Sequence, residues 1–567
     1  MTRAVPALLL LGALLLAGVG VDVLTAPPAA AHATIVSTSP ADGARLDAVP
    51  DAVTLQFDEP VSLGAGYARV LGADGERADT GAAEVGDDTV TVPLRDGLPE
   101  SGYLVTYRVV SADSHPVSGA FSFVVGDGEL LAVDAAITDA DVHPVVAAAL
   151  PAARWLGYLG LALGVGIPLT LAVCWPGGWA VPLLRRLTLA GLGAVAVGAL
   201  LGVLLQGPYA AGAGPGSLLD PDLLGATLGS TYGLTLLARL LLAAALAGLL
   251  AAGWRAGRPP ARGLLVGAGV LAAVLVVAVA AVGHPVAGPL PGLAVPVAAV
   301  HAAAMAGWLG GLTALFAGAL RRREDAAERV GELALALPRW SRLAAGLIAA
   351  LVVTGVLQSV REVGTLSALL TTTYGWLLVV KLVLVLGVLV AALVSRDWVQ
   401  QRLGDRRRDR VATAGSPAEH LGVLRRSVLL ELAGAAAVLA LSAALVGTPP
   451  ARAAVADPVE VTLPLQSATG TDGTVQVTLA PASPGPASLH VYLYDDAGTL
   501  IQPQQITVSL TEPQQEIGPL DVELAGAGPG HYIGDPVLPT AGTWTLTVTV
   551  RLDEFTARTA STTFPVR

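Results

Sequence analysis

The chain has 567 residues, of which 53% are hydrophobic, and this apolar content excludes an ordinary soluble protein and indicates several membrane spans. Its formal net charge of −11 argues against a nucleic-acid partner. The single cysteine, Cys174, excludes an intramolecular disulfide.

Residues 1–31 have the features of a signal peptide. Arg3 provides the positive start, an apolar run follows, and Ala29 and Ala31 place small residues at a cleavage site. Cleavage after Ala31 would make His32 the first residue, so that its free amine and imidazole could chelate one metal ion. The alternative is an uncleaved anchor helix.

Residues 32–126 predict a small all-β domain, because short alternating strands are separated by Gly, Pro and Asp turns. Within it, Asp113 and His115 are two residues apart and would share one face of a strand. With His32 they form a set of nitrogen and oxygen donors that favours Cu(II). The alternative is a surface histidine beside a turn aspartate.

Three segments of this domain, HATIVSTSPADGARLDAVP, LQFDEPV and YRVVSADSHPVSGAFSFVVG, resemble the CopC copper-binding family. The resemblance implies an immunoglobulin-like or cupredoxin-like β-sandwich. It also implies that His32, Asp113 and His115 bind Cu(II), with Glu59 near the metal. The domain has no methionine, so the Met-rich Cu(I) site of some family members is not expected.

After a linker at 127–153, residues 154–450 predict an eight-helix transmembrane bundle. Basic residues gather in alternate loops, which the positive-inside rule places in the cytoplasm. Both polar flanks would then be extracytoplasmic, in agreement with the signal peptide. The predicted spans lie near 155–174, 188–206, 232–252, 263–283, 295–319, 342–360, 375–395 and 427–447.

The membrane block contains an internal repeat, about 154–283 and 295–447. The sequence Thr-Tyr-Gly at 231–233 precedes Arg239, and the same sequence at 373–375 precedes Lys381 at equal spacing. Four spans per repeat give both halves the same orientation, a parallel duplication.

The segments GHPVAG (283–288), HAAAMAGWLGGL (301–312) and TYGWLLVVKLVLVLG (373–387) resemble the CopD family. This resemblance implies copper passage across the bacterial inner membrane, usually as import.

Three membrane residues are candidate copper ligands. His284 follows the fourth span at its outer end, and His301 and Met305 lie on one face of the fifth helix at i, i+4 spacing. This order would suit a change from Cu(II)-type to Cu(I)-type ligands. The alternative is that His301 hydrogen-bonds a neighbouring helix and Met305 packs in the core.

Charged residues inside the block need partners. Arg239 and Lys381 are expected to pair with carboxylates such as Asp220, Asp222 or Glu362, or to hold an anionic group. For Glu431, an ion pair with the neighbouring Arg425 and Arg426 is favoured over a role as an exit ligand.

Residues 451–567 predict a second extracytoplasmic β domain. The pattern GPLDVEL…GPGHYIGDPVLPTAGTWTLTVTVR resembles a YtkA-type β-sandwich. His490 and His531 could bind metal, but neither has a second ligand at close spacing, so a structural or docking role is favoured.

Together these features predict a non-enzymatic, multi-pass copper transport protein of the bacterial inner membrane. It would capture Cu(II) outside and pass copper, as Cu(I) where methionine is a ligand, inward. Its expected partners are the copper ion, the lipid bilayer and an extracytoplasmic copper chaperone. One rival function is extracytoplasmic copper sequestration by a membrane-anchored protein. Another is a haem-type redox protein using His284 and His301.

Overall fold

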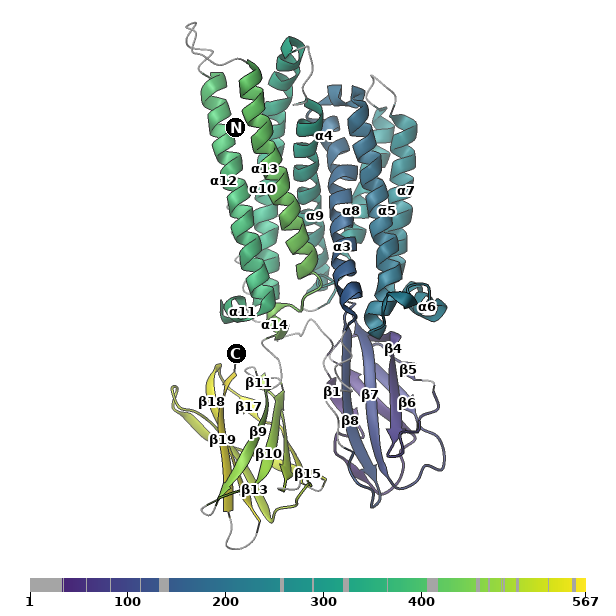
Figure 1. The fold of residues 1–567 in the computed structure, drawn as a ribbon, viewed down its shortest axis with the longest axis vertical. Coiled ribbons are helices and arrows are strands. Elements are labelled where there is room, and N and C mark those ends of the chain that lie inside the picture. The colour runs from purple at the N-terminus through teal and green to yellow at the C-terminus, as the bar shows by residue number, and fades with distance from the viewer. Residues whose placement is uncertain are drawn as a thin grey trace.

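The structure is a computed structural model that describes residues 33–566 with gaps. The gaps are 34, 58, 82, 113, 132–141, 255–259, 288–289, 320–325, 365, 405–416, 455–458, 468–469, 481, 483–484, 496–498, 529 and 553–556. A helix bundle carries two β domains, and both lie at the same end of the bundle (Figure 1). The predicted signal peptide lies outside the described residues.

The N-terminal domain is a sandwich of two four-stranded sheets, as predicted. One sheet has the order β1-β3-β6-β5 and the other β2-β8-β7-β4. Strict alternation of buried and half-buried residues along β3 and β6 places Val53, Leu55 and Val90 in the core between them. The strands are β1 (Ile35–Ser39), β2 (Arg45–Leu46), β3 (Ala52–Phe57), β4 (Val61–Gly72), β5 (Glu84–Val85), β6 (Thr89–Pro93), β7 (Gly102–Ser111) and β8 (Pro116–Val125).

Eight helical segments are long and apolar enough to cross a membrane, in agreement with the predicted number. The first begins at Pro144, earlier than the predicted start at 154, because the His143 ring accepts a hydrogen bond from Val145 N and caps the helix. The segments are α3 (Pro144–Leu161) continued by η1 (Ala162–Gly166) and α4 (Ile167–Val173), α5 (Pro182–Ala211), α7 (Thr231–Gly253), α8 (Arg262–Ala280), α9 (Pro291–Ala314), α10 (Ala326–Val363), α12 (Thr373–Gly404) and α13 (Pro417–Leu445). Short helices α6 (Pro221–Gly229), α11 (Leu366–Thr371) and α14 (Ala451–Ala454) lie between or after them.

The first helices of the two repeats meet at a glycine contact. A Cβ atom on Gly166 would lie 1.9 Å from the carbonyl oxygen of Ala306, and one on Gly310 would lie 2.3 Å from that of Ala162. Only glycine allows the two backbones to approach so closely, which is the usual way in which membrane helices pack. The two halves of the bundle are therefore joined along α3, η1 and α9.

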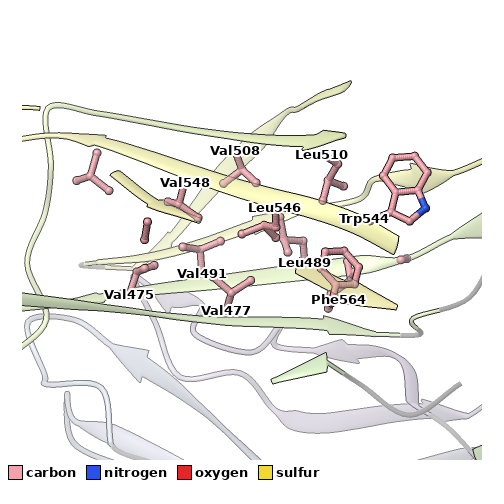
Figure 2. Packing of buried hydrophobic residues seen from close by; sticks show 14 of the residues in the cluster. Val475, Val477, Leu489, Val491, Val508, Leu510, Trp544, Leu546, Val548 and Phe564 are labelled. Atoms are coloured by element: carbon pink, nitrogen blue, oxygen red, sulfur yellow. The ribbon is translucent and has the colours of Figure 1, made fainter. Parts of the chain in front are cut away.

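The C-terminal domain is built from one continuous sheet of nine strands in the order β14-β13-β18-β19-β9-β10-β12-β16-β15. Strands β19 and β9 share a single residue pair, Thr559 with Gln466. This weak pairing divides the sheet into two parts that face each other. Figure 2 shows core residues from both parts, including Val477 of β10 and Trp544 of β18, packed between them. The strands are β9 (Val459–Ser467), β10 (Gly470–Ala480), β12 (Ser488–Tyr494), β13 (Gln505–Glu512), β14 (Ile517–Val522), β15 (Leu524–Gly528), β16 (His531–Gly534), β18 (Gly542–Arg551) and β19 (Ala557–Val566), with a separate pair β11 (Gly485–Pro486) and β17 (Val537–Leu538).

Leu546→Ala should destabilise the C-terminal domain by about 2–5 kcal/mol, since it leaves a cavity in a core where Leu546 is 1% exposed. Pulse proteolysis of the full-length protein across a urea series would measure this. Thr549→Ala on the other face of β18 is the matched control and should cost no more than about 1 kcal/mol. Equal cleavage midpoints for both variants would contradict the packing described.

Candidate metal centre

The turn between β7 and β8 positions His115. Ser111 donates two hydrogen bonds to the carbonyl oxygen of His115, from its amide and its hydroxyl group, both at 3.0 Å. Ser114 closes the turn in the left-handed region, with φ of 75°. His115 thereby lies immediately before β8 with its side chain buried, at 4% exposure.

This turn rests directly on the C-terminal end of α5. Gln206 Nε2 donates to the carbonyl oxygen of Ser114 at 2.8 Å, and Arg108 Nε donates to that of Ala210. Arg108 and Gln206 are both buried, so each hydrogen bond forms away from competing water. The N-terminal domain and the membrane block are therefore docked at the turn that carries His115.

The docking brings His115 next to His284 of the membrane block. Their ring centroids are 5.9 Å apart, with an angle of 29° between the ring planes. Tyr209 of α5 contacts His115 from one side at 6.4 Å, and Tyr374 of α12 contacts His284 at 6.2 Å. Two imidazoles from different domains thus share one enclosed aromatic site.

Arg361 and Glu362, at the end of α10, fix the segment that carries His284. Arg361 donates to the carbonyl oxygens of His284, at 2.9 Å, and of Ala287, and it also pairs with Glu362. Glu362 Oε2 lies 3.9 Å from His284 Nδ1. A carboxylate therefore joins the two imidazoles at the site, which the sequence did not predict.

Two of the predicted CopC-type ligands, His32 and Asp113, lie outside the described residues. Glu59 lies just before β4, and the register pairs Val61 of that strand with Ser111 at the His115 turn. Glu59 is therefore at the same end of the sheet as His115. Within the described ranges, no group of three or more His, Cys, Asp or Glu side chains is arranged to hold a metal ion.

His301 hydrogen-bonds a neighbouring helix, with Nδ1 2.8 Å from Thr354 Oγ1. The single hydroxyl proton of Thr354 is donated to the Ala350 carbonyl oxygen at 2.6 Å, so Thr354 must accept from His301 Nδ1–H. This fixes the tautomer and leaves the Nε2 lone pair of His301 for a ligand. Met305, one turn further, packs against the apolar clusters around α3 and α8.

The ion pairs expected inside the block are not formed by the described residues. Arg239 donates to the carbonyl oxygens of Ala278 and Val279, at 3.0 and 3.3 Å, at the end of α8. Asp220 instead caps α6, and Glu362 pairs with Arg361.

The predicted ion pair of Glu431 with Arg425 and Arg426 is likewise wrong for the described chain. Ser427, one turn away on the same helix, donates to Glu431 at 3.3 Å. The Arg425 guanidinium instead lies over the Phe316 ring, 5.1 Å from its centroid.

His490 and His531 are brought together at the contact between the two β domains. Strands β12 and β16 place His490 Nδ1 3.1 Å from His531 Nε2. Tyr492 stacks on His531 and donates to Asp42 of the N-terminal domain at 3.2 Å. A Cβ atom on Gly43 would lie 1.8 Å from His531 Nδ1. Neither histidine has a second ligand close in sequence, but the structure brings the two rings together; their structural or docking role stays a prediction.

Three family matches cover most of the N-terminal and membrane regions. Residues 35–126 match the CopC domain, residues 145–293 match the copper resistance protein D-like N-terminal domain, and residues 334–445 match copper resistance protein D. The chain is a fused CopC/CopD protein. The two D-type matches fall on the two repeats of the membrane block.

Individual relatives of the fused CopC/CopD protein cover parts of it. It is 34% identical over 206 residues to the copper transport protein CutJ of Bacillus subtilis (strain 168), an alignment spanning 35% of this chain and 37% of CutJ. It is 36% identical over 105 residues to protein YobA of Escherichia coli (strain K12), spanning 18% of this chain and 85% of YobA. Among solved structures, CopC from Methylosinus trichosporium OB3b is 26% identical, with a TM-score of 0.16, and covers 18% of this chain and 100% of that one.

Acid should loosen the contact between the two β domains. Burial lowers the pKa of His531 to about 3 and also lowers that of His490. Both rings are therefore neutral when the domains are docked. Docking weakens as the pH falls below the usual histidine pKa of about 6.5, because protonation then favours the undocked state. For His531 alone, the loss of docking free energy at pH 5 is about 2 kcal/mol. Burial raises the pKa of Asp42, which partly opposes this effect.

Spin labels at Glu84→Cys and Thr543→Cys, in a Cys174→Ala background, would measure the distance between the two β domains. The readout is the electron–electron distance distribution of the protein in nanodiscs. We expect a narrow distribution at pH 7.5 and a broader one at pH 5. His531→Gln should reduce the response. A distribution independent of pH in both proteins would show that the histidines do not control docking.

Proposed function

We propose that the fused CopC/CopD protein captures Cu(II) in its N-terminal domain and passes copper inward through the membrane block. The observation that carries this proposal is the contact between His115 and His284, with ring centroids 5.9 Å apart. A ligand of the capture domain and a ligand candidate of the membrane block then lie within one site. Copper leaving His115 would not need to enter bulk water.

The donors along this path suit copper at each step. Imidazole and carboxylate, the donor types of His115, His284 and Glu362, favour Cu(II), although these three described side chains do not form one metal-holding group as they stand. Deeper in the block, His301 presents its Nε2 lone pair because Thr354 holds the other nitrogen. Met305 follows on the same helix, and a thioether favours Cu(I). The path contains no catalytic step, and any reduction of copper would come from a separate reductant.

The arrangement of the domains supports an extracytoplasmic site of capture. Both β domains lie at one end of the bundle (Figure 1), and basic residues such as Arg185, Arg262 and Arg339 lie near the opposite helix ends. By the positive-inside rule that opposite end is cytoplasmic. We therefore place the protein in the bacterial inner membrane with His115 and His284 on the outer side.

Copper measurements in separated cell fractions test import against sequestration. Import predicts that expression raises copper in the cytoplasm of copper-exposed cells, measured after removal of the envelope. Sequestration predicts a rise confined to the envelope. A rise only in the envelope would overturn the proposed inward passage.

His284→Gln and Glu362→Gln should each lower cytoplasmic copper accumulation at least about tenfold, because each removes a donor at the entrance. Copper bound by the N-terminal domain should remain. Glu84→Gln, a matched change at an exposed strand residue, should have no effect. Full accumulation in the His284→Gln protein would exclude this residue from the path.

One extra alanine before His32 should greatly weaken Cu(II) binding, since it separates the terminal amine from the imidazole. The comparison uses purified full-length protein with a native His32 terminus and the extended version, titrated with Cu(II) and followed by electron paramagnetic resonance. His115→Ala should weaken binding as well. Equal binding by the native and extended proteins would exclude the terminal chelate.

A further inference from the structure

A cavity of about 50 Å³ lies inside the first repeat, between α3, α5, α7 and α8. Its polar lining consists of two arginines and two tyrosines: Arg154, Tyr158, Tyr232 and Arg239. The rest of the lining is apolar or glycine. Every polar side chain around this space is therefore a hydrogen-bond donor, and two of them carry a positive charge.

The two guanidinium groups lack a carboxylate partner among the described residues. Arg239 is held in place by two carbonyl oxygens at the end of α8, which use Nε and Nη2. The acidic residues expected nearby have other roles, as Asp220 caps α6 and Glu362 pairs with Arg361. Two cations around one cavity within the span of a membrane are costly unless an anion compensates them.

The second repeat differs at the corresponding positions. Its Thr-Tyr-Gly tyrosine, Tyr374, lies beside His284, with ring centroids 6.2 Å apart, and the position matching Arg239 is Lys381. His301, bonded to Thr354, lies in this half. The cavity of the first repeat repels a metal cation, so its occupant is not copper. This conclusion does not depend on the proposed copper path.

We propose that this cavity binds one phosphate-class oxyanion through Arg154, Arg239 and the two tyrosine hydroxyl groups. A water molecule needs roughly 10–15 Å³ of such space, so the cavity has room for a group several times larger. Guanidinium forks match the oxygens of a phosphate group, and phenol hydroxyl groups add neutral donors. The phosphate group belongs either to a free anion or to the headgroup of a lipid.

The test uses purified full-length protein in phosphate-free buffer and neutral detergent. Binding of radiolabelled inorganic phosphate is measured by scintillation proximity, and phospholipid that remains bound is measured by native mass spectrometry. We expect one site per chain. Arg154→Gln should weaken binding at least about tenfold, and Tyr158→Phe, which keeps the ring, should weaken it a few fold.

Arg262→Gln, at the opposite end of α8, is the matched control and should bind like the wild type. Phosphate binding without retained phospholipid identifies a free anion, and one retained phospholipid that Arg154→Gln loses identifies a lipid headgroup. Absence of both ligands from the wild type would overturn the proposal, as would equal binding by wild type, Arg154→Gln and Tyr158→Phe.

Discussion

The position of His284 at the contact between the membrane block and the N-terminal domain depends on the guanidinium group of Arg361. It bonds two carbonyl oxygens of the segment that carries His284 and pairs with Glu362. A buried carboxylate beside an imidazole would be costly by itself, and the adjacent cation offsets that cost. Because the same group holds the backbone of His284, one side chain both compensates the charge of Glu362 and positions the His284 backbone. The contact with His115 follows from this arrangement.

The two repeats share a scaffold and differ in chemistry. Each carries a Thr-Tyr-Gly helix start followed by a basic residue. In the first repeat Tyr232 and Arg239 line a cavity with two further donors. In the second, Tyr374 faces His284. Duplication thus provided two similar helix bundles whose side chains differ: the first repeat surrounds its cavity with hydrogen-bond donors, and the second places its tyrosine beside His284.

Much of the architecture follows from the sequence because hydropathy and alternation report burial locally. The eight spans and both β domains could be predicted in this way, whereas the role of His115 as a ligand, suggested by the D-x-H segment, stays a prediction. The contacts between domains could not, since nothing local in the sequence relates Gln206 to Ser114 or His490 to Asp42. The role of Glu362 was missed for the same reason. The expected pairing of Glu362 with Arg239 or Lys381 was based only on the depth of these basic residues in the membrane. The actual partner is Arg361, the neighbour of Glu362 in the sequence.

The attachment of the His115 turn to α5 has a kinetic consequence. Two ligands in one chain meet at an effective concentration set by their tether, in the millimolar range or above, rather than by the amount of protein in the cell. Under the proposed function, delivery across the Gln206 contact is a first-order event, independent of expression level. The receiving ligands also need not bind copper tightly enough to capture it from dilute solution. Copper would exchange directly between neighbouring ligands, without dissociation and recapture.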